Sequence, residues 1–153
     1  MIEGVLGRIS GVMFAKHLPE ALSFAWDVPE CLQTTWLPRK NQIGLIELLA
    51  PVVAVHTFRS YLTGRRLLLF TDSSCAEGCL VRGNSSKEDL CSLVSVFWNE
   101  VADLSVDTYI DRVPTDGNPA DDGSRGMAEQ QALAFNWELV RAELPKFVAS
   151  VLK

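Results

Sequence analysis

The sequence lacks any apolar run long enough to cross a membrane, because none of its uninterrupted stretches approaches the ~18 residues that a spanning helix needs. Its amino-terminal segment, MIEGVLGRIS, carries Glu3 and has no unbroken apolar stretch, so it is typical neither of a secretory signal nor of an Arg-rich transit peptide. We therefore expect an intracellular protein, in the cytoplasm or the nucleus, with no membrane partner.

The four cysteines show none of the spacings that mark a cross-linked or zinc-bound protein. Cys31, Cys75, Cys79 and Cys91 form no CxxC pair, and no histidine follows them at zinc-finger spacing. We expect reduced and mostly buried thiols. Cys75 and Cys79 would share one helix face, but two ligands do not make a metal site.

Basic charge is scarce as well. The chain carries 14 Lys and Arg against 19 Asp and Glu, a formal net charge of −5, and the excess acid falls in residues 93–153. We therefore do not expect a protein that binds DNA or RNA only by neutralising phosphates with Lys and Arg side chains. The same composition leaves room for an enzyme whose acidic side chains hold metal ions that meet the phosphates.

What the sequence does contain is the pattern of one folded domain. Its 153 residues include 48% hydrophobic residues and four Trp, which excludes an intrinsically disordered chain. The pattern predicts, in order, a hairpin of strands 8–14 and 21–28, a helix at 39–62, a strand at 67–71, helices at about 73–81 and 87–104, a strand at 106–113, a loop, and a helix at 127–152 broken near Pro145. We expect a three-layer α/β fold with a mixed β-sheet flanked by helices.

Three of these elements carry sharper expectations. The LLLF run of the 67–71 strand is typical of a central strand covered on both faces. Pro51 lies inside the first helix, where we expect it to kink the helix or reset its start. Ser73 or Ser74 is a candidate N-cap for the short helix, and Gly83 a candidate for its end.

Three acidic residues stand where a purely structural role would not favour them. Glu47 lies within an apolar helical stretch, Asp72 follows a fully apolar strand at the edge where α/β sheets gather ligands, and Asp121 lies in a loop about to enter the last helix. Each taken singly has a structural explanation, as a half-exposed helix residue, a turn former or a helix cap. Together they form a more specific pattern.

That pattern resembles the ribonuclease H-like superfamily, and in particular its retroelement branch. The segments that carry the resemblance are IELLA at residues 46–50, TDSSCA at residues 71–76, NPADDGSR at residues 118–125, and the VRGNS turn at residues 81–85. The resemblance covers about residues 8–125, which it marks as the core of a single domain spanning residues 1–153, with a C-terminal helical extension at about 127–152.

The resemblance implies a nuclease that cleaves the RNA strand of RNA–DNA hybrids. In that family, clustered carboxylates hold two divalent ions, Mg²⁺ or Mn²⁺, which activate a water molecule and stabilise the leaving oxygen. Glu47, Asp72 and Asp121 are then the catalytic and metal-binding residues, and Asp122 replaces Asp121 if the register shifts by one. Neither His17 nor His56 matches a motif position, and we expect both to be structural or surface residues.

The sequence departs from the family at its first strand, which in relatives carries a further catalytic Asp. The earliest Asp here is Asp27, at the end of a strand in the wrong place. The resemblance therefore implies weak or absent nuclease activity for this sequence alone. It also implies an edge or gap beside the 67–71 strand, which either an inward shift of the hairpin or a strand from a protein partner would close. Two alternatives stay open: a catalytically dead ribonuclease H-like domain that acts as a structural or protein-binding subunit, and an unrelated α/β fold in which the acids are caps.

Overall fold

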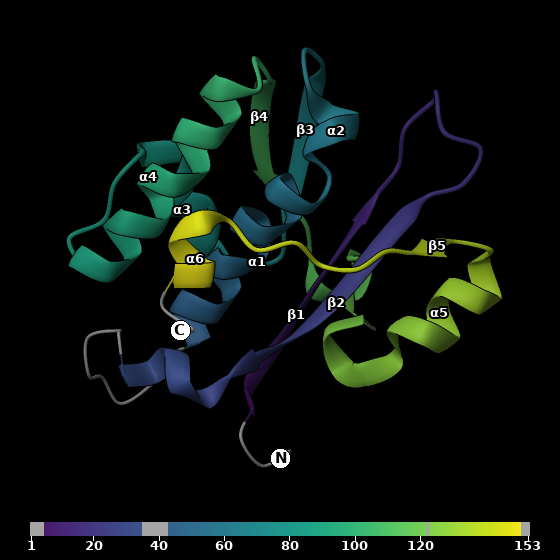
Figure 1. The fold of residues 1–153 in the computed structure, drawn as a ribbon, viewed down its shortest axis with the longest axis horizontal. Coiled ribbons are helices and arrows are strands. Elements are labelled where there is room, and N and C mark those ends of the chain that lie inside the picture. Colours follow the sequence, from purple (N-terminus) through teal and green to yellow (C-terminus); the bar gives the residue numbers. More distant parts are fainter. Residues whose placement is uncertain (1–4, 35–42, 122, 151–153) are drawn as a thin grey trace.

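The structure is a computed structural model that describes residues 5–34, 43–121 and 123–150 of the chain. Within these residues it is a mixed α/β protein with a mixed sheet flanked by helices, as predicted (Figure 1). The elements in chain order are β1 (Val5–Met13), β2 (Leu22–Pro29), η1 (Glu30–Thr34), α1 (Ile43–Thr57), α2 (Arg59–Leu62), β3 (Arg66–Thr71), α3 (Ser74–Arg82), α4 (Glu88–Asp103), β4 (Asp107–Arg112), η2 (Thr115–Gly117), η3 (Gly123–Met127), α5 (Ala128–Phe135), β5 (Glu138–Leu139) and α6 (Lys146–Ser150).

The predicted hairpin is confirmed. Strands β1 and β2 pair antiparallel, with Ile9 opposite Trp26 and Met13 opposite Leu22. Gly11 is required in this hairpin, because a Cβ at that position would lie 2.5 Å from a ring carbon of Phe24. Strand β5 adds to the outer edge of β2 in parallel orientation and makes this first sheet mixed.

Strands β3 and β4 form a second sheet and pair in parallel with each other along their whole length. The strands are therefore divided between two sheets: within the described residues, β3 is hydrogen-bonded to β4 alone and β1 to β2 alone. A parallel pair isolated in this way is unusual, because parallel sheets are normally buried on both faces.

The expectation that β3 is covered on both faces is also wrong. Leu67 and Leu69 pack against the core, whereas Leu68 and Phe70 on the opposite face are 58% and 52% exposed. The physical reason is that the apolar run reports only the composition of the strand, while coverage depends on elements that pack against each face. Helices α3 and α4 lie on the side of the core (Figure 1).

Helix α1 runs as one helix through Pro51, so the alternative that this residue resets the start of the helix is wrong. Its neighbours explain why: Leu48, Leu49, Val52 and Val53 are all at most 2% exposed. Burial of four large apolar side chains outweighs the backbone hydrogen bond that the proline removes.

Helices α3 and α4 begin and end where local signals predict. The Ser73 side chain accepts a hydrogen bond from the Ala76 N–H at 3.0 Å, and Gly83 ends α3 with a φ of +76°. The inner face of α4 is apolar and buried, and consists of Leu90, Leu93, Val94, Phe97 and Val101. Trp98 joins the two helices by donating to the Leu80 carbonyl at 2.9 Å.

The predicted C-terminal helix breaks well before Pro145. Helix α5 ends at Asn136, which adopts a left-handed φ of +57°, and the chain then extends along β2, where Val140 N–H donates to Ser23 O at 2.8 Å. Only α6 resumes helical structure, and it buries Val148. Long-range pairing with β2 therefore overrides the helical pattern of this segment.

None of the helices within the described residues combines the length and the apolar character that a membrane-spanning helix requires.

Candidate functional site

Asp72 lies where the sequence places it, at the carboxyl end of β3. Strands β3 and β4 are parallel and end at the same edge, where the Val113 N–H donates to Thr71 O at 2.9 Å. Asp72 is half-buried, and the backbone turns immediately after it into α3. This is the edge at which open α/β sheets collect their ligands.

Glu47 reaches the same edge from α1. The Ser73 hydroxyl donates to Glu47 Oε2 at 2.5 Å and accepts from the Ala76 N–H, so one nearly buried side chain serves both as helix cap and as partner of the carboxylate. Glu47 and Asp72, far apart in sequence, are thereby held on either side of Ser73. Two of the three predicted site residues are in one neighbourhood.

The thiol nearest to this neighbourhood is not poised for chemistry. Burial raises the pKa of the Cys75 thiol, and the Cys79 thiol and the Glu47 carboxylate raise it further. A raised pKa keeps the thiol protonated, whereas a nucleophile or metal ligand has to be a thiolate. All four cysteines are free, but the expectation that they are mostly buried is wrong: Cys79 is buried, Cys91 is half-buried, and Cys31 and Cys75 are exposed.

Asp121 is held by different contacts, on the loop that follows β4. Its backbone N–H donates to Asn118 O at 3.1 Å, and the Ser10 hydroxyl of β1 donates to the neighbouring Ala120 carbonyl. The loop is thus fastened to the first sheet, and Asp121 lines a hollow beside α5. Asp122 lies outside the described residues.

The three predicted ligands do not yet make a metal centre. Their oxygen donors suit Mg²⁺ in kind. However, within residues 5–34, 43–121 and 123–150 no three His, Cys, Asp or Glu side chains are close enough to hold a metal ion. These residues alone therefore do not fit a two-metal site, and the assignment of Glu47, Asp72 and Asp121 as ligands stays a prediction.

Asp27, the earliest Asp in the sequence, has a structural partner. Arg8 donates to both of its carboxylate oxygens, at 2.6 and 3.2 Å, across the β1–β2 pair. This hydrogen bonding lowers the pKa of Asp27. The contact agrees with the expectation that Asp27 is not the catalytic Asp of a first strand.

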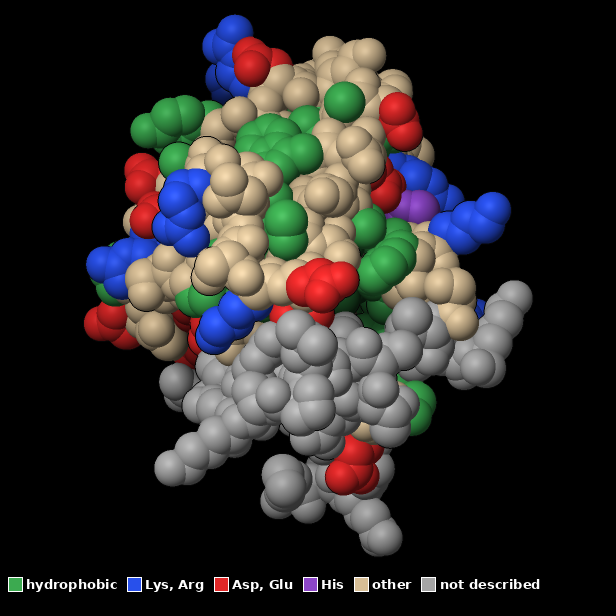
Figure 2. Space-filling model, turned by 90° about the vertical axis from the view of Figure 1, so that its left-hand side faces the viewer, with side chains coloured by type: hydrophobic (Ala, Val, Ile, Leu, Met, Phe, Trp, Pro, Cys, Tyr) green, Lys and Arg blue, Asp and Glu red, His purple; other side chains and the backbone are tan. Residues whose placement is uncertain are grey.

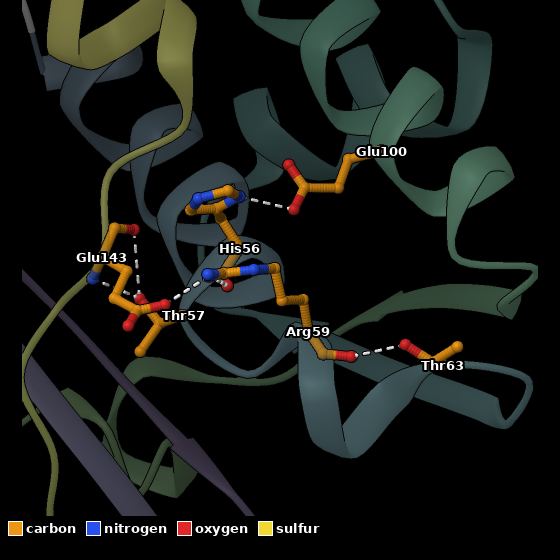
Figure 3. Close-up of polar contacts among 6 residues, drawn as sticks. All are labelled: His56, Thr57, Arg59, Thr63, Glu100 and Glu143. Atoms are coloured by element: carbon orange, nitrogen blue, oxygen red, sulfur yellow. Dashed lines mark hydrogen bonds and ion pairs between the residues drawn. The ribbon is translucent and has the colours of Figure 1, made fainter.

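A second polar cluster, which sequence reasoning missed, lies at the end of α1 (Figure 3). His56 Nδ1 lies 2.6 Å from Glu100 Oε1 of α4, and Arg59 donates to the His56 carbonyl at 2.7 Å and to the Glu143 carboxylate. Thr57 Oγ1 accepts from the Glu143 N–H at 3.0 Å. These partners are 44 to 86 residues apart in sequence, so no local pattern could have indicated them.

One face of the molecule shows how its basic side chains are distributed. On the face drawn in Figure 2, the Lys and Arg side chains of the described residues are scattered among Asp and Glu and do not gather into one basic patch. This distribution agrees with the acidic net charge of the chain.

Comparisons of the chain with protein-family models, with curated proteins and with solved structures found no match. The class that the structure defines is therefore a mixed α/β protein with a mixed sheet flanked by helices.

Proposed function

We propose that this chain is a ribonuclease H-like domain of retroelement origin, which cleaves the RNA strand of RNA–DNA hybrids once one further acidic strand completes its sheet. The observation that supports the proposal is the hydrogen bond from Ser73, the residue after Asp72, to the Glu47 carboxylate at the carboxyl end of β3, a strand with one edge that pairs with no described strand. The motifs around these residues are the ones that carry the family resemblance.

Strands β1 and β3 each offer an edge for an added strand. They run in opposite directions (Figure 1), and among the described residues each is paired with one strand, β1 with β2 and β3 with β4. Adjacent residues of α1 contact both sheets: a Cβ at Gly7 of β1 would lie 3.1 Å from Ile46, and Glu47 bonds to Ser73 just after β3. One strand, at ~4.8 Å from each neighbour, would pair antiparallel with β1 and parallel with β3.

An added strand would also bring the missing carboxylate to the site. Two divalent cations, Mg²⁺ or Mn²⁺, supply the hydrolytic chemistry in the family that the chain resembles. The described residues do not form that centre alone, so Glu47, Asp72 and Asp121 are proposed as ligands only in the completed domain. The strand comes from a protein partner or from a longer form of the same chain.

A second function is a catalytically inactive ribonuclease H-like domain that serves as a structural or protein-binding subunit. The observation that favours it is that the Glu47 carboxylate is already engaged by the Ser73 hydroxyl and that the described acids do not converge. Here the open edge of β3 would bind a partner strand without any reaction following.

One experiment separates the two. Cleavage of an RNA–DNA hybrid with Mg²⁺ or Mn²⁺ is measured for the chain alone, for the chain extended upstream by an Asp-bearing strand, and for a control in which that Asp is Asn. The proposal expects cleavage only by the Asp-bearing extension. An extended chain that folds and pairs but does not cleave supports the inactive subunit, and cleavage by the unextended chain contradicts the need for an added strand.

A further inference from the structure

The hollow beside α5 has an aromatic wall and an acidic wall. Its volume is about 910 Å³, and it opens between the loop that follows β4 and the end of α5. Phe135 and Trp137 form one side, and Asp116, Asn118 and Asp121 line the other. Gln131 of α5 donates to Pro119 O at 2.5 Å and ties the two walls together.

The aromatic wall is held in place and still accessible. The rings of Phe135 and Trp137 stack with centroids 5.0 Å apart and planes 22° apart, and the Phe14 ring contacts Trp137 edge-on at 5.7 Å. The backbone N–H of Trp137 also donates to the backbone carbonyl of Ala132 at 2.8 Å. Phe135 remains 62% exposed, so part of its ring is open to a ligand.

The acidic lining of the hollow favours a positively charged ligand. Two carboxylates line it, and no Lys, Arg or His is among the described residues that do. Residues 93–153, which supply all of its walls, carry ten acidic and five basic side chains. A phosphate would be repelled by this arrangement, whereas a cation is attracted both by the carboxylates and by the faces of the rings.

We propose that the hollow binds an arginine side chain presented by a basic segment of a partner protein. A guanidinium group is planar, so it stacks on the Phe135 ring while its N–H groups donate to carboxylate oxygens at its edge. A lysine ammonium group carries the same charge but has no flat face that can stack on the ring. This site shares Asp121 with the proposed metal centre, but it does not require cleavage or the added strand, because Asp116, Phe135 and Trp137 also line the hollow.

The test is isothermal titration calorimetry of the folded chain with a short peptide containing arginines, with the same peptide carrying lysines, and with a single-stranded RNA oligonucleotide. We expect the arginine peptide to bind about tenfold more tightly than the lysine peptide. Phe135→Ala should weaken binding about tenfold and Asp116→Asn about fivefold. Leu133→Ala, on the same helix and 86% exposed, is the matched control and should change nothing.

Circular dichroism of each variant checks that the fold is intact, which the exposure of Phe135 and Asp116 favours. The proposal would be overturned by no measurable binding of the arginine peptide, by equal losses for Phe135→Ala and Leu133→Ala, or by RNA binding that Phe135→Ala weakens. The last result would assign the aromatic wall to a nucleobase. Added NaCl should weaken peptide binding, and binding unaffected by salt would equally contradict a cation site.

Discussion

The Ser73 hydroxyl donates to the Glu47 carboxylate at 2.5 Å while it accepts from the Ala76 N–H at 3.0 Å. One side chain thus caps α3 and fixes the carboxylate of α1. Because Ser73 is only 5% exposed, both hydrogen bonds are shielded from water, and neither partner is easily replaced by solvent.

Replacing Ser73 with Ala should therefore destabilise the fold. The variant loses a helix cap and leaves Glu47 without its hydroxyl partner, and we expect the free energy of unfolding to fall by about 2 kcal/mol. Urea denaturation measures the change. Ser74→Ala, at the exposed first position of α3, is the control and should stay within about 0.5 kcal/mol. Similar losses in both variants would show that the contact with Glu47 contributes nothing.

In the domain extended by an acidic strand, the proposed function predicts that Glu47→Gln and Asp72→Asn each reduce hybrid cleavage at least ~100-fold, because each variant removes a negative oxygen from a proposed ligand. Initial rates at saturating Mg²⁺ give the comparison. The control is Asp107→Asn, whose side chain is 80% exposed and pairs only with exposed Arg66. Asp121→Asn decides whether the loop residue belongs to the site: a loss like that of Asp72→Asn includes it, and full activity removes it.

The pair between Arg8 and Asp27 should make stability depend on pH. The hydrogen bond from Arg8 lowers the folded-state pKa of Asp27 below its unfolded value of about 3.9. Its stabilisation is therefore fully present above that unfolded value and is lost as the pH falls through the folded-state pKa. Asp27 is 39% exposed, so the effect is screened to about 0.5 kcal/mol.

Urea unfolding of the wild type and of Asp27→Asn at about pH 7 and about pH 2 checks this prediction. The wild type should be the more stable protein at neutral pH, and the difference should shrink in acid. A difference that persists at low pH would mean that packing, and not the charge of Asp27, supports the hairpin.

The open face of β3 should tolerate polar substitution in the chain alone. Leu68→Thr and Phe70→Thr replace side chains that are more than half exposed, so we expect changes in unfolding free energy within about 0.5 kcal/mol. Leu69→Thr, on the face that packs against the core, should cost more than 1 kcal/mol. Thermal denaturation compares the three, and equal losses would show that both faces of β3 are covered in solution.

The end of α5 offers a test of backbone conformation. Asn136 has a φ of +57°, which disfavours residues with an ordinary Cβ. Asn136→Ala should destabilise by about 1 kcal/mol, whereas Asn136→Gly should be nearly neutral. If both variants unfold at the same urea concentration, the helix does not end in a left-handed residue.

Elements whose signals are local were predictable from the sequence. The N-cap at Ser73, the glycine at position 83 and the apolar face of α4 each depend on residues a turn or two apart. The placement of Asp72 at a strand end follows from the same kind of signal. The apolar residues around Glu47 predicted that it lies near the buried side of its helix. They did not predict that its carboxylate accepts a hydrogen bond from the Ser73 hydroxyl.

What could not be predicted depends on distant partners. The separation of the strands into two sheets depends on which edges meet, and a strand pattern does not encode that choice. The sequence pattern after Asn136 predicts a helix, but this segment is extended because it pairs with β2. The cluster of His56 with Glu100, and of Arg59 with Glu143, likewise joins residues that no local window contains.

The course of this last segment has a consequence for how the domain is made. The hairpin built near the beginning of the chain obtains its third strand from Glu138 and Leu139, and Glu143 then fastens the end of α1. The ribosome synthesises these residues long after the hairpin, so the first sheet cannot close until they have emerged. Folding should be governed by this late, long-distance closure, and nascent chains that end before residue 138 should remain open to proteases and to chaperones.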